Sequence, residues 1–197
     1  MQWTVVVPVK PAAMAKSRLG LGPQLARAIA LDTVAAAVAC PLVSRVIVVT
    51  ADPAFRPPDA EVVAETAPAG IDAAVRAGAS LAAGGPLAAL LGDLPALRPA
   101  DLAEALTLAA AHPRAFVADR EGVGTTLVTA LEAPLITAFG DGSARRHREL
   151  GLAPLTPRPA STIEVDVDTV EQLAVATALG LGPATSTAAR AAEEGRG

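Results

Sequence analysis

The sequence predicts an α/β protein whose mostly parallel, Rossmann-like sheet is covered by helices on both faces. Short apolar runs rich in β-branched residues alternate with helical stretches, which is typical of parallel sheets with crossover helices. Charged residues fall where the expected strands end, the edge at which such sheets bind ligands. The 197 residues contain no internal repeat and no long linker, so we expect a single domain large enough to bury a core.

The first half of the chain gives three strands and two helices. Residues 3–9 (WTVVVPV) are apolar and β-branched, as expected of a buried strand. Residues 23–39 are expected to form a helix, because Pro23 suits a first turn. Residues 44–50 (SRVIVVT) predict a second strand. A short third strand is expected at residues 61–65, followed by a helix at residues 70–83.

The second half continues this alternation. A fourth strand, residues 87–91, ends at Gly92-Asp93, and a helix at residues 99–111 stops at His112-Pro113. The remaining expected elements are strands at 114–118 and 125–130, a short helix at 143–150, a strand at 163–168 and a helix at 170–179. Residues 182–197 are rich in Gly, Ala, Ser, Thr and Glu, and we expect a mobile tail after a single domain of residues 1–181.

Composition excludes several classes of protein. The net charge of −4 argues against a general nucleic-acid binder, which usually carries a basic surface. A single cysteine, Cys40, excludes an internal disulfide. Uncharged stretches are broken by Gly and Pro and are too short to span a bilayer, so we expect a soluble, cytoplasmic protein without a membrane partner. The oligomeric state stays open.

The loop after the first expected strand concentrates positive charge. Lys10 and Lys16 are the only lysines, and with Arg18 they place three cations within nine residues. A nucleoside triphosphate carries about four negative charges and is a natural partner for such a loop. The loop lacks both the Walker A pattern and G-x-G-x-x-G, so side-chain cations would replace part of the usual backbone cradle. A solvated surface loop is the alternative.

Carboxylates follow two other expected strands. Asp93 comes directly after the fourth strand, and Asp166 and Asp168 stand two apart, so that they share one face of an extended segment. Two neighbouring carboxylates repel each other unless a cation lies between them. Ligands that are all oxygen favour Mg²⁺ or Mn²⁺. The alternatives are a strand-end turn for Asp93 and a solvated edge strand for the pair.

Two further stretches could bind a small acid. E-G-V-G-T-T-L offers glycines and the hydroxyl of Thr125, and F-G-D-G-S-A-R-R-H places Ser143 as the expected N-cap of a helix. A helix N-terminus preceded by glycines favours an anion such as a carboxylate or phosphate. Capping and turn formation alone are the alternative. We expect His147 to be a surface or packing residue rather than a catalyst.

Five stretches, in this order, resemble one family: P-V-K…A-K-S-R-L, G-D-L-P-A-L, G-T-T-L, F-G-D-G-S-A-R-R-H and V-D-V-D-T-V-E-Q-L. They are similar to motifs of the phosphoenolpyruvate / 2-phospho-L-lactate guanylyltransferases of coenzyme F-420 biosynthesis, and the resemblance covers nearly all of residues 3–180. It implies a nucleotidyltransferase fold of the glycosyltransferase-A type. It also implies transfer of GMP from GTP to a small phosphorylated acid, with release of pyrophosphate.

The resemblance assigns roles to individual residues. It implies Mg²⁺ ligands at Asp93, Asp166 and Asp168, an acceptor site at Thr125, Gly140 and Ser143, and contacts to the GTP phosphates from Lys10, Lys16 and Arg18. Asp93 and the three cations would form the catalytic set. The family's Gly-Leu-Asn stretch near the guanine is here Gly70-Ile71-Asp72. Asp72 could accept hydrogen bonds from guanine N1–H and N2–H₂, or could only cap a helix.

The expected activity is guanylyl transfer to phosphoenolpyruvate or 2-phospho-L-lactate by in-line attack on the α-phosphorus of GTP. The acceptor phosphate is already ionised at neutral pH, so the reaction needs no general base. Two alternatives remain open at this point. One is a related nucleotidyltransferase that uses another nucleotide or another acceptor, such as a sugar phosphate or molybdopterin. The other is a nucleotide-binding protein without catalysis.

Overall fold

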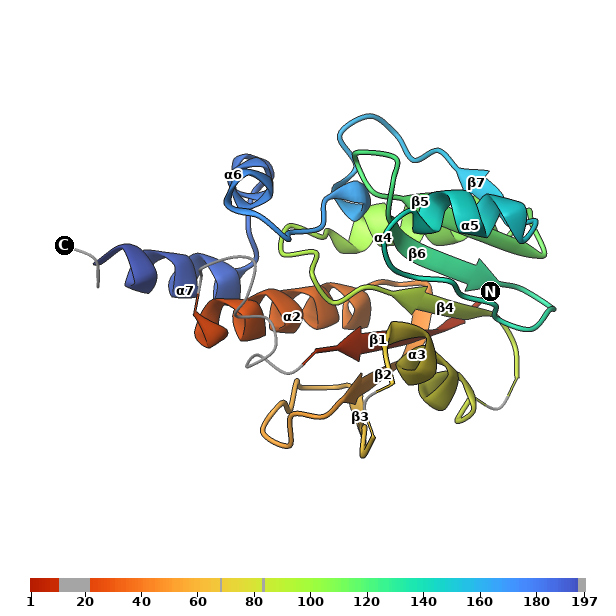
Figure 1. The fold of residues 1–197 in the computed structure, drawn as a ribbon, viewed down its shortest axis with the longest axis horizontal. Coiled ribbons are helices and arrows are strands. Elements are labelled where there is room, and N and C mark those ends of the chain that lie inside the picture. The colour runs from red at the N-terminus through yellow and green to blue at the C-terminus, as the bar shows by residue number, and fades with distance from the viewer. Residues whose placement is uncertain (11–21, 68, 83, 195–197) are drawn as a thin grey trace.

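The computed structural model of the chain describes residues 1–10, 22–67, 69–82 and 84–194 (Figure 1). Within these residues, seven strands form a mixed sheet in the order β3-β2-β1-β4-β6-β5-β7. The strands are β1 (Trp3–Val9), β2 (Val43–Thr50), β3 (Glu61–Ala64), β4 (Leu87–Leu90), β5 (Arg114–Ala118), β6 (Thr125–Ala130) and β7 (Ala153–Leu155). The predicted α/β class and the first six strands are confirmed.

The sheet changes direction at β6. Strands β1 to β4 pair in parallel, whereas β6 runs antiparallel to both β4 and β5, and β7 is again parallel to β5. The short connection between β5 and β6 permits only antiparallel pairing, since parallel neighbours need a long crossover. As a result, the beginning of β6 lies at the same edge of the sheet as the carboxyl end of β4, and Leu91 N donates to Thr126 O over 2.9 Å.

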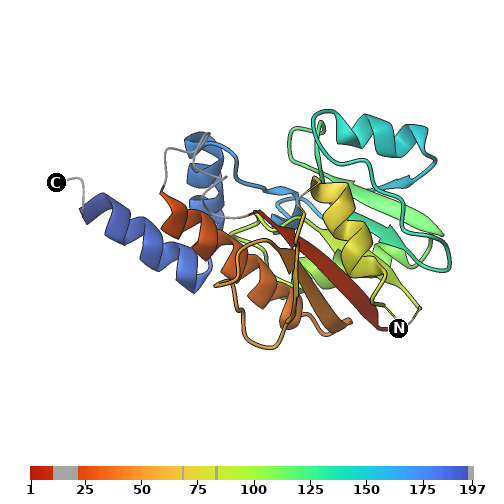
Figure 2. The ribbon, with the colours of Figure 1, turned by 60° about the horizontal axis from the view of Figure 1, so that its bottom comes forward.

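Six described helices surround the sheet: α2 (Pro23–Val38), α3 (Ile71–Ala79), α4 (Pro99–Ala109), α5 (Ser143–Glu149), α6 (Val170–Leu179) and α7 (Pro183–Glu194). Helices α2 and α4 cover one face, and α3 and α5 cover the other (Figures 1 and 2). Both faces of β1 are therefore buried. Val5 and Val7 pack in the core under α2 and α4, while Val6 packs with Ala74 of α3.

The strand predicted at residues 163–168 is wrong. Residues Thr162–Glu164 form a short 3₁₀ helix, η1, and the chain continues outside the sheet without regular secondary structure until α6. This segment is attached by the amide of Val167, which donates to Asp93 O over 3.0 Å. Val165 and Val167 are buried against α2 while Asp166 and Asp168 are more exposed. This alternation of buried and exposed residues resembles that of a half-buried strand, but here the buried side chains pack against a helix rather than within a sheet.

The C-terminal segment also differs from its prediction. Where a mobile tail was expected, Pro183–Glu194 form α7, which lies beside α2 (Figure 1). The carboxylate of Asp32, buried on α2, accepts hydrogen bonds from Ala184 N (3.1 Å) and Thr185 N (2.7 Å). Asp32 thus satisfies two of the amides that a helix N-terminus leaves unpaired. The composition of the segment alone gave no sign of this partner on a distant helix.

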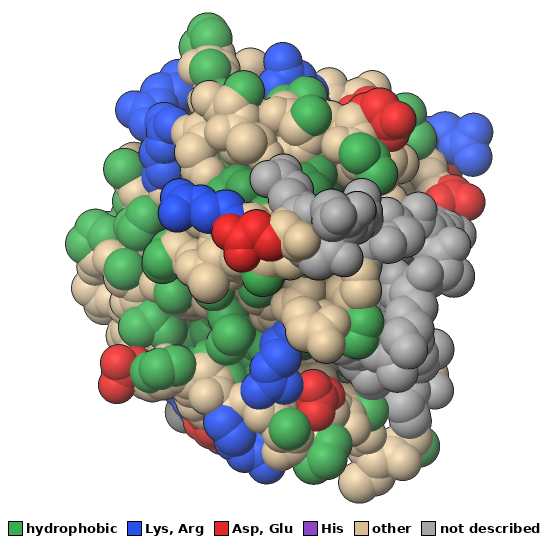
Figure 3. All heavy atoms as spheres, turned by 90° about the vertical axis from the view of Figure 1, so that its left-hand side faces the viewer, with side chains coloured by type: hydrophobic (Ala, Val, Ile, Leu, Met, Phe, Trp, Pro, Cys, Tyr) green, Lys and Arg blue, Asp and Glu red, His purple; other side chains and the backbone are tan. Residues whose placement is uncertain are grey.

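The surface at the α6 and α7 end of the molecule carries acidic and basic side chains interspersed among apolar ones (Figure 3). This mixture agrees with the modest net charge of −4. None of the helices in the described ranges combines the length and the apolar composition that crossing a membrane requires.

Candidate active site

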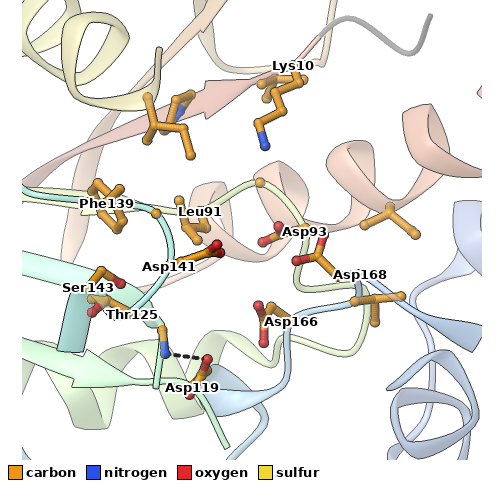
Figure 4. Close-up of a pocket in the computed structure, with 18 of the residues that line it drawn as sticks. Lys10, Leu91, Asp93, Asp119, Thr125, Phe139, Asp141, Ser143, Asp166 and Asp168 are labelled. Atoms are coloured by element: carbon orange, nitrogen blue, oxygen red, sulfur yellow. Dashed lines mark hydrogen bonds between the residues drawn. The ribbon is translucent and has the colours of Figure 1, made fainter. Parts of the chain in front are cut away.

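A pocket of about 500 Å³ lies at the edge of the sheet where β1 and β4 end and β6 begins (Figure 4). Its lining brings together residues from widely separated parts of the chain. Predicted site residues that line it are Lys10, Asp93, Thr125, Gly140, Ser143, Asp166 and Asp168. This is the edge where ligands gather in open α/β sheets, because the strand ends leave a crevice between the connecting loops.

Lys10 follows β1 directly, and its ammonium group points into the pocket toward the carboxylates (Figure 4). Its positive charge lowers the pKa of Asp93, but burial and the charge of Asp168, which both raise that pKa, have the larger effect. Of the three cations that the sequence places far from the carboxylates, Lys10 is thus the one that the described residues bring to them. Lys16 and Arg18, the other two predicted cations, lie outside the described residues.

The acidic side of the pocket carries more negative charge than Lys10 can balance. Burial raises the pKa of Asp93 to about 6, and the charge of Asp168 adds to this rise. Burial, together with the charges of Asp93 and Asp119, likewise raises the pKa of Asp166 to about 8. Both pKa values mean that ionising these carboxyl groups is costly unless a cation is nearby.

Two carboxylate oxygens in this group find no hydrogen-bond donor in the part of the chain that the structure describes. Oδ1 of Asp93 and Oδ1 of Asp166 are buried, and no donor among the described residues reaches either of them. A buried oxygen without a donor costs free energy that coordination to a cation would remove. The chemistry of these groups, which are hard oxygen ligands of high charge, fits a divalent ion such as Mg²⁺ or Mn²⁺.

Asp119 is a pocket residue that the sequence analysis missed. It follows β5, and its carboxylate accepts hydrogen bonds from Val123 N (2.8 Å) and Gly124 N (2.6 Å), which fixes the turn that leads into β6. Three carboxylate oxygens lie within 4.8 Å of one another, one each from Asp119, Glu121 and Asp166. An aspartate directly after an expected strand was a usable signal, since the same signal identified Asp93.

Opposite the acids lie Thr125, at the start of β6, and Ser143, the first residue of α5. Both are buried, with 3% and 1% of their surface exposed. Gly140 and Gly142 adopt positive φ angles of 109° and 69°, and so turn the chain into α5. Such angles strain any residue with a Cβ atom, which accounts for glycine at both positions.

The prediction that Ser143 caps α5 is wrong, because Gly142 occupies the N-cap position. The anion site expected at this helix terminus stays a prediction. Two of its amides already have partners, since Ser143 N donates to Gly140 O over 3.0 Å and Ala144 N donates to Val123 O over 3.0 Å. Besides its backbone, this terminus contributes the hydroxyl-bearing side chain of Ser143 to the lining of the pocket.

Gly70 and Asp72 do not line the pocket, although Ile71 between them does. Gly70 is the N-cap of α3, with a φ angle of 93°, and Asp72 lies in the first turn of that helix. Asp72 Oδ1 accepts a hydrogen bond from Phe139 N over 3.1 Å, which ties α3 to the loop before α5. One lone pair of the residue predicted to read guanine thus already has a partner within the protein.

His147 is fully buried on α5, although the sequence analysis also allowed a surface position. Its Nδ1 lies 2.9 Å from Thr125 Oγ1, and its Nε2 accepts a hydrogen bond from Ala138 N over 2.9 Å. The pKa of His147 is lowered to about 4, mainly by burial; the charge of Asp72 opposes this lowering and that of Arg146 adds to it. The imidazole is therefore neutral at physiological pH.

Solved structures similar to this chain support the fold. A nucleotidyl transferase from Methanothermobacter matches with a TM-score of 0.65 at 19% identity, covering 90% of this chain and 97% of that one. A Mycobacterium tuberculosis protein solved in complex with manganese matches with a TM-score of 0.62 at 18% identity, covering 89% and 97%. The predicted nucleotidyltransferase fold is thereby confirmed.

No protein-family model matches the chain. Curated relatives match over almost the whole length, and each bears the name phosphoenolpyruvate guanylyltransferase. Those of Streptomyces scabiei and Streptomyces coelicolor are 46% and 47% identical, with 96% of both chains covered. That of Salinispora arenicola is 48% identical, with 93% of this chain and 92% of the relative covered. Identity at this level over this length shows that the chain belongs to the phosphoenolpyruvate guanylyltransferase family.

Proposed function

We propose that this protein is a guanylyltransferase that moves GMP from GTP to phosphoenolpyruvate, with release of pyrophosphate, in coenzyme F-420 biosynthesis. The observation that carries this proposal is the pocket itself. It joins a cation after β1, carboxylates after β4 and before α6, and two hydroxyl side chains. The names of relatives at 46–48% identity support the same activity.

The GTP phosphates would lie against Lys10, where a compact ammonium on a flexible stem can follow a moving phosphate. Lys16 and Arg18 remain the predicted further contacts. The guanine would lie toward α3, beside Ile71. Since Asp72 already accepts from Phe139 N, its second oxygen is the one that could accept from the guanine edge.

Mg²⁺ would be held by Asp93, Asp166 and Asp168, whose oxygens point into the pocket (Figure 4). The oxygens of Asp93 and Asp166 that no donor reaches within the described ranges support this assignment. Asp119 and Glu121 are the neighbouring carboxylates that could complete the set. When bound, the ion would neutralise phosphate charge and favour in-line displacement.

The chain's own residues would do the remaining work by alignment and charge. Thr125, Gly140 and Ser143 would hold the acceptor, and Lys10 would offset the repulsion between acceptor phosphate and GTP. An acceptor phosphate oxygen would form a bond to the α-phosphorus of GTP. The bond from that phosphorus to the β-phosphate oxygen would break, and its electron pair would leave with pyrophosphate. The product is enolpyruvyl-diphospho-guanosine.

The acceptor and the nucleotide can be identified in one assay. Purified protein with Mg²⁺ is given GTP and, in turn, phosphoenolpyruvate, 2-phospho-L-lactate or 3-phosphoglycerate, and pyrophosphate release is measured. We expect phosphoenolpyruvate to give the highest kcat/KM. The preferred acid is then tested with ATP, CTP and UTP, and we expect each of them to give a lower kcat/KM than GTP. Tight GTP binding without release from any acid would favour a non-catalytic nucleotide-binding protein instead.

A further inference from the structure

His147 joins the two segments that form the acceptor side of the pocket. It lies on α5, between the rings of Phe116 and Phe139, whose centroids are 5.6 and 5.5 Å from its own. Through Nδ1 it reaches Thr125 on β6, and through Nε2 it reaches Ala138 in the loop before α5. Both ring nitrogens therefore have partners, and the ring is held on two sides by aromatic packing.

The partner of Nε2 determines where the imidazole carries its proton. A backbone amide can only donate, so Nε2 must accept from Ala138 N. A neutral imidazole that accepts at one nitrogen carries its hydrogen on the other. Nδ1–H must then donate to Thr125 Oγ1, and the lowered pKa of His147 agrees with a neutral ring.

This direction of donation leaves the hydroxyl hydrogen of Thr125 available. The oxygen accepts from His147, and within the described part of the chain no acceptor is found for the hydrogen. Because Thr125 lines the pocket, its hydroxyl hydrogen is free to point into the pocket. If the ring carried its proton on Nε2 instead, Thr125 would donate to Nδ1 and would present only lone pairs to a ligand.

We propose that His147 is a positioning residue that holds the Thr125 hydroxyl as a hydrogen-bond donor toward an anionic oxygen of the phosphorylated acid. The same ring, through Ala138, fixes the loop that carries Gly140 and leads into Ser143 relative to β6. This inference rests on the proposed function, because it deepens the acceptor site of that reaction. It assigns to the site a preference for groups that accept hydrogen bonds, namely carboxylate or phosphate oxygens.

Two substitutions of His147 separate its two hydrogen bonds. In His147→Asn the side-chain amide can still donate near the Nδ1 position, whereas in His147→Gln the amide oxygen can still accept near the Nε2 position. We expect His147→Gln to raise the KM for phosphoenolpyruvate about tenfold or more, with the KM for GTP changed by less than about twofold. His147→Asn should retain more of the affinity for the acid than His147→Gln.

A double-mutant cycle tests whether His147 acts through Thr125. Thr125→Val removes the hydroxyl group at nearly constant shape. We expect it to raise the KM for phosphoenolpyruvate strongly in the wild type but only slightly in His147→Gln, because the donor is already misdirected there. Equal effects in both backgrounds, or equal losses of affinity for GTP and for the acid, would show that His147 only packs.

Inhibition by pyruvate and by inorganic phosphate, measured in the wild type and in Thr125→Val, identifies the oxygen that Thr125 contacts. The anion whose inhibition weakens in the variant carries that oxygen. Equal inhibition of both proteins by both anions would overturn the proposal.

Nitrogen NMR of ¹⁵N-histidine-labelled wild-type protein needs no variant to fold. We expect His147 to show a protonated Nδ1 and an unprotonated Nε2 between pH 6 and pH 8. A protonated Nε2 would overturn the inference. If the wild type released no pyrophosphate with any of the three acids, the proposed function would fail, while the NMR result would still decide the state of the ring.

Discussion

The ammonium group of Lys10 and the carboxylate of Asp93 face each other from the ends of two adjacent parallel strands, β1 and β4 (Figure 4). Lys10 comes directly after β1, and Asp93 follows the end of β4 in the next loop. The register of the two strands therefore fixes the position of one residue relative to the other. The field of Lys10 lowers the pKa of Asp93 but does not outweigh burial and the charge of Asp168. This imbalance accounts for the cation requirement that we propose.

Replacing Asp166 by Asn should abolish turnover while the fold survives. The change removes a ligand of the proposed ion, and we expect pyrophosphate release to fall by at least about a hundredfold. Without added metal the variant should melt no lower than the wild type, because a costly buried charge is lost. Thermal melting and turnover are measured together, with the exposed Glu132→Gln, outside the pocket, as a matched control. Full activity of Asp166→Asn would contradict the metal assignment.

Metal binding should strengthen as the pH rises from 6 to 8. The pKa values of Asp93 and Asp166, about 6 and about 8, lie above their unfolded values. Their contribution to the stability of metal-free protein is therefore full at low pH and is lost as the pH rises through these values. A divalent ion binds the ionised forms and reverses this loss.

The test is the increase in melting temperature that MgCl₂ or MnCl₂ produces at each pH. We expect this increase to grow between pH 6 and pH 8, and to grow much less in Asp166→Asn. An increase that stays constant across this range in the wild type would show that these carboxyl groups do not bind the ion.

Lys10→Ala should weaken GTP binding. Lys10 is exposed at the pocket, so solvent screens its charge, and we expect the KM for GTP to rise about tenfold rather than by several orders of magnitude. Arg27, a half-buried cation paired with Asp52 outside the pocket, offers a control as Arg27→Ala. An unaltered GTP affinity in Lys10→Ala would remove Lys10 from the phosphate site.

Asp32→Ala should destabilise α7. The substitution removes the acceptor for the amides of Ala184 and Thr185, and each lost buried hydrogen bond of this kind costs about 1–2 kcal/mol. We expect a lower melting temperature and faster hydrogen exchange at these two amides. Gly182→Ala should act in the same direction, since its Cβ would lie 2.3 Å from Asp32 Cγ. Unchanged exchange in both variants would show that Asp32 does not hold α7.

Sequence patterns predicted the fold where local composition and packing agree. The β-branched runs of β1 and β2 are buried on both faces, and their composition has no other simple explanation. The segment around Asp166 has the same apolar alternation, yet α2 takes the place of a neighbouring strand. Alternation reports which side chains are buried and does not report what buries them.

Long-range hydrogen bonds explain most of the remaining differences. The partners of α7 lie on α2, about 150 residues earlier in the chain, so no local pattern could show that the C-terminal segment is ordered. The hydrogen bonds of His147 to Thr125 and Ala138 could not be predicted, because no sequence pattern indicates that these residues contact it. Asp119 was missed for a different reason, since its position after a strand is the signal that identified Asp93.

Phosphorus NMR of one reaction mixture tests the central claim most directly. With the wild-type protein, GTP, phosphoenolpyruvate and Mg²⁺, we predict signals of pyrophosphate and of a diphosphate with two inequivalent phosphorus atoms, and we predict that EDTA abolishes both. The same signals in the presence of EDTA, or GTP consumed without the unsymmetrical diphosphate, would contradict metal-dependent guanylyl transfer in this pocket.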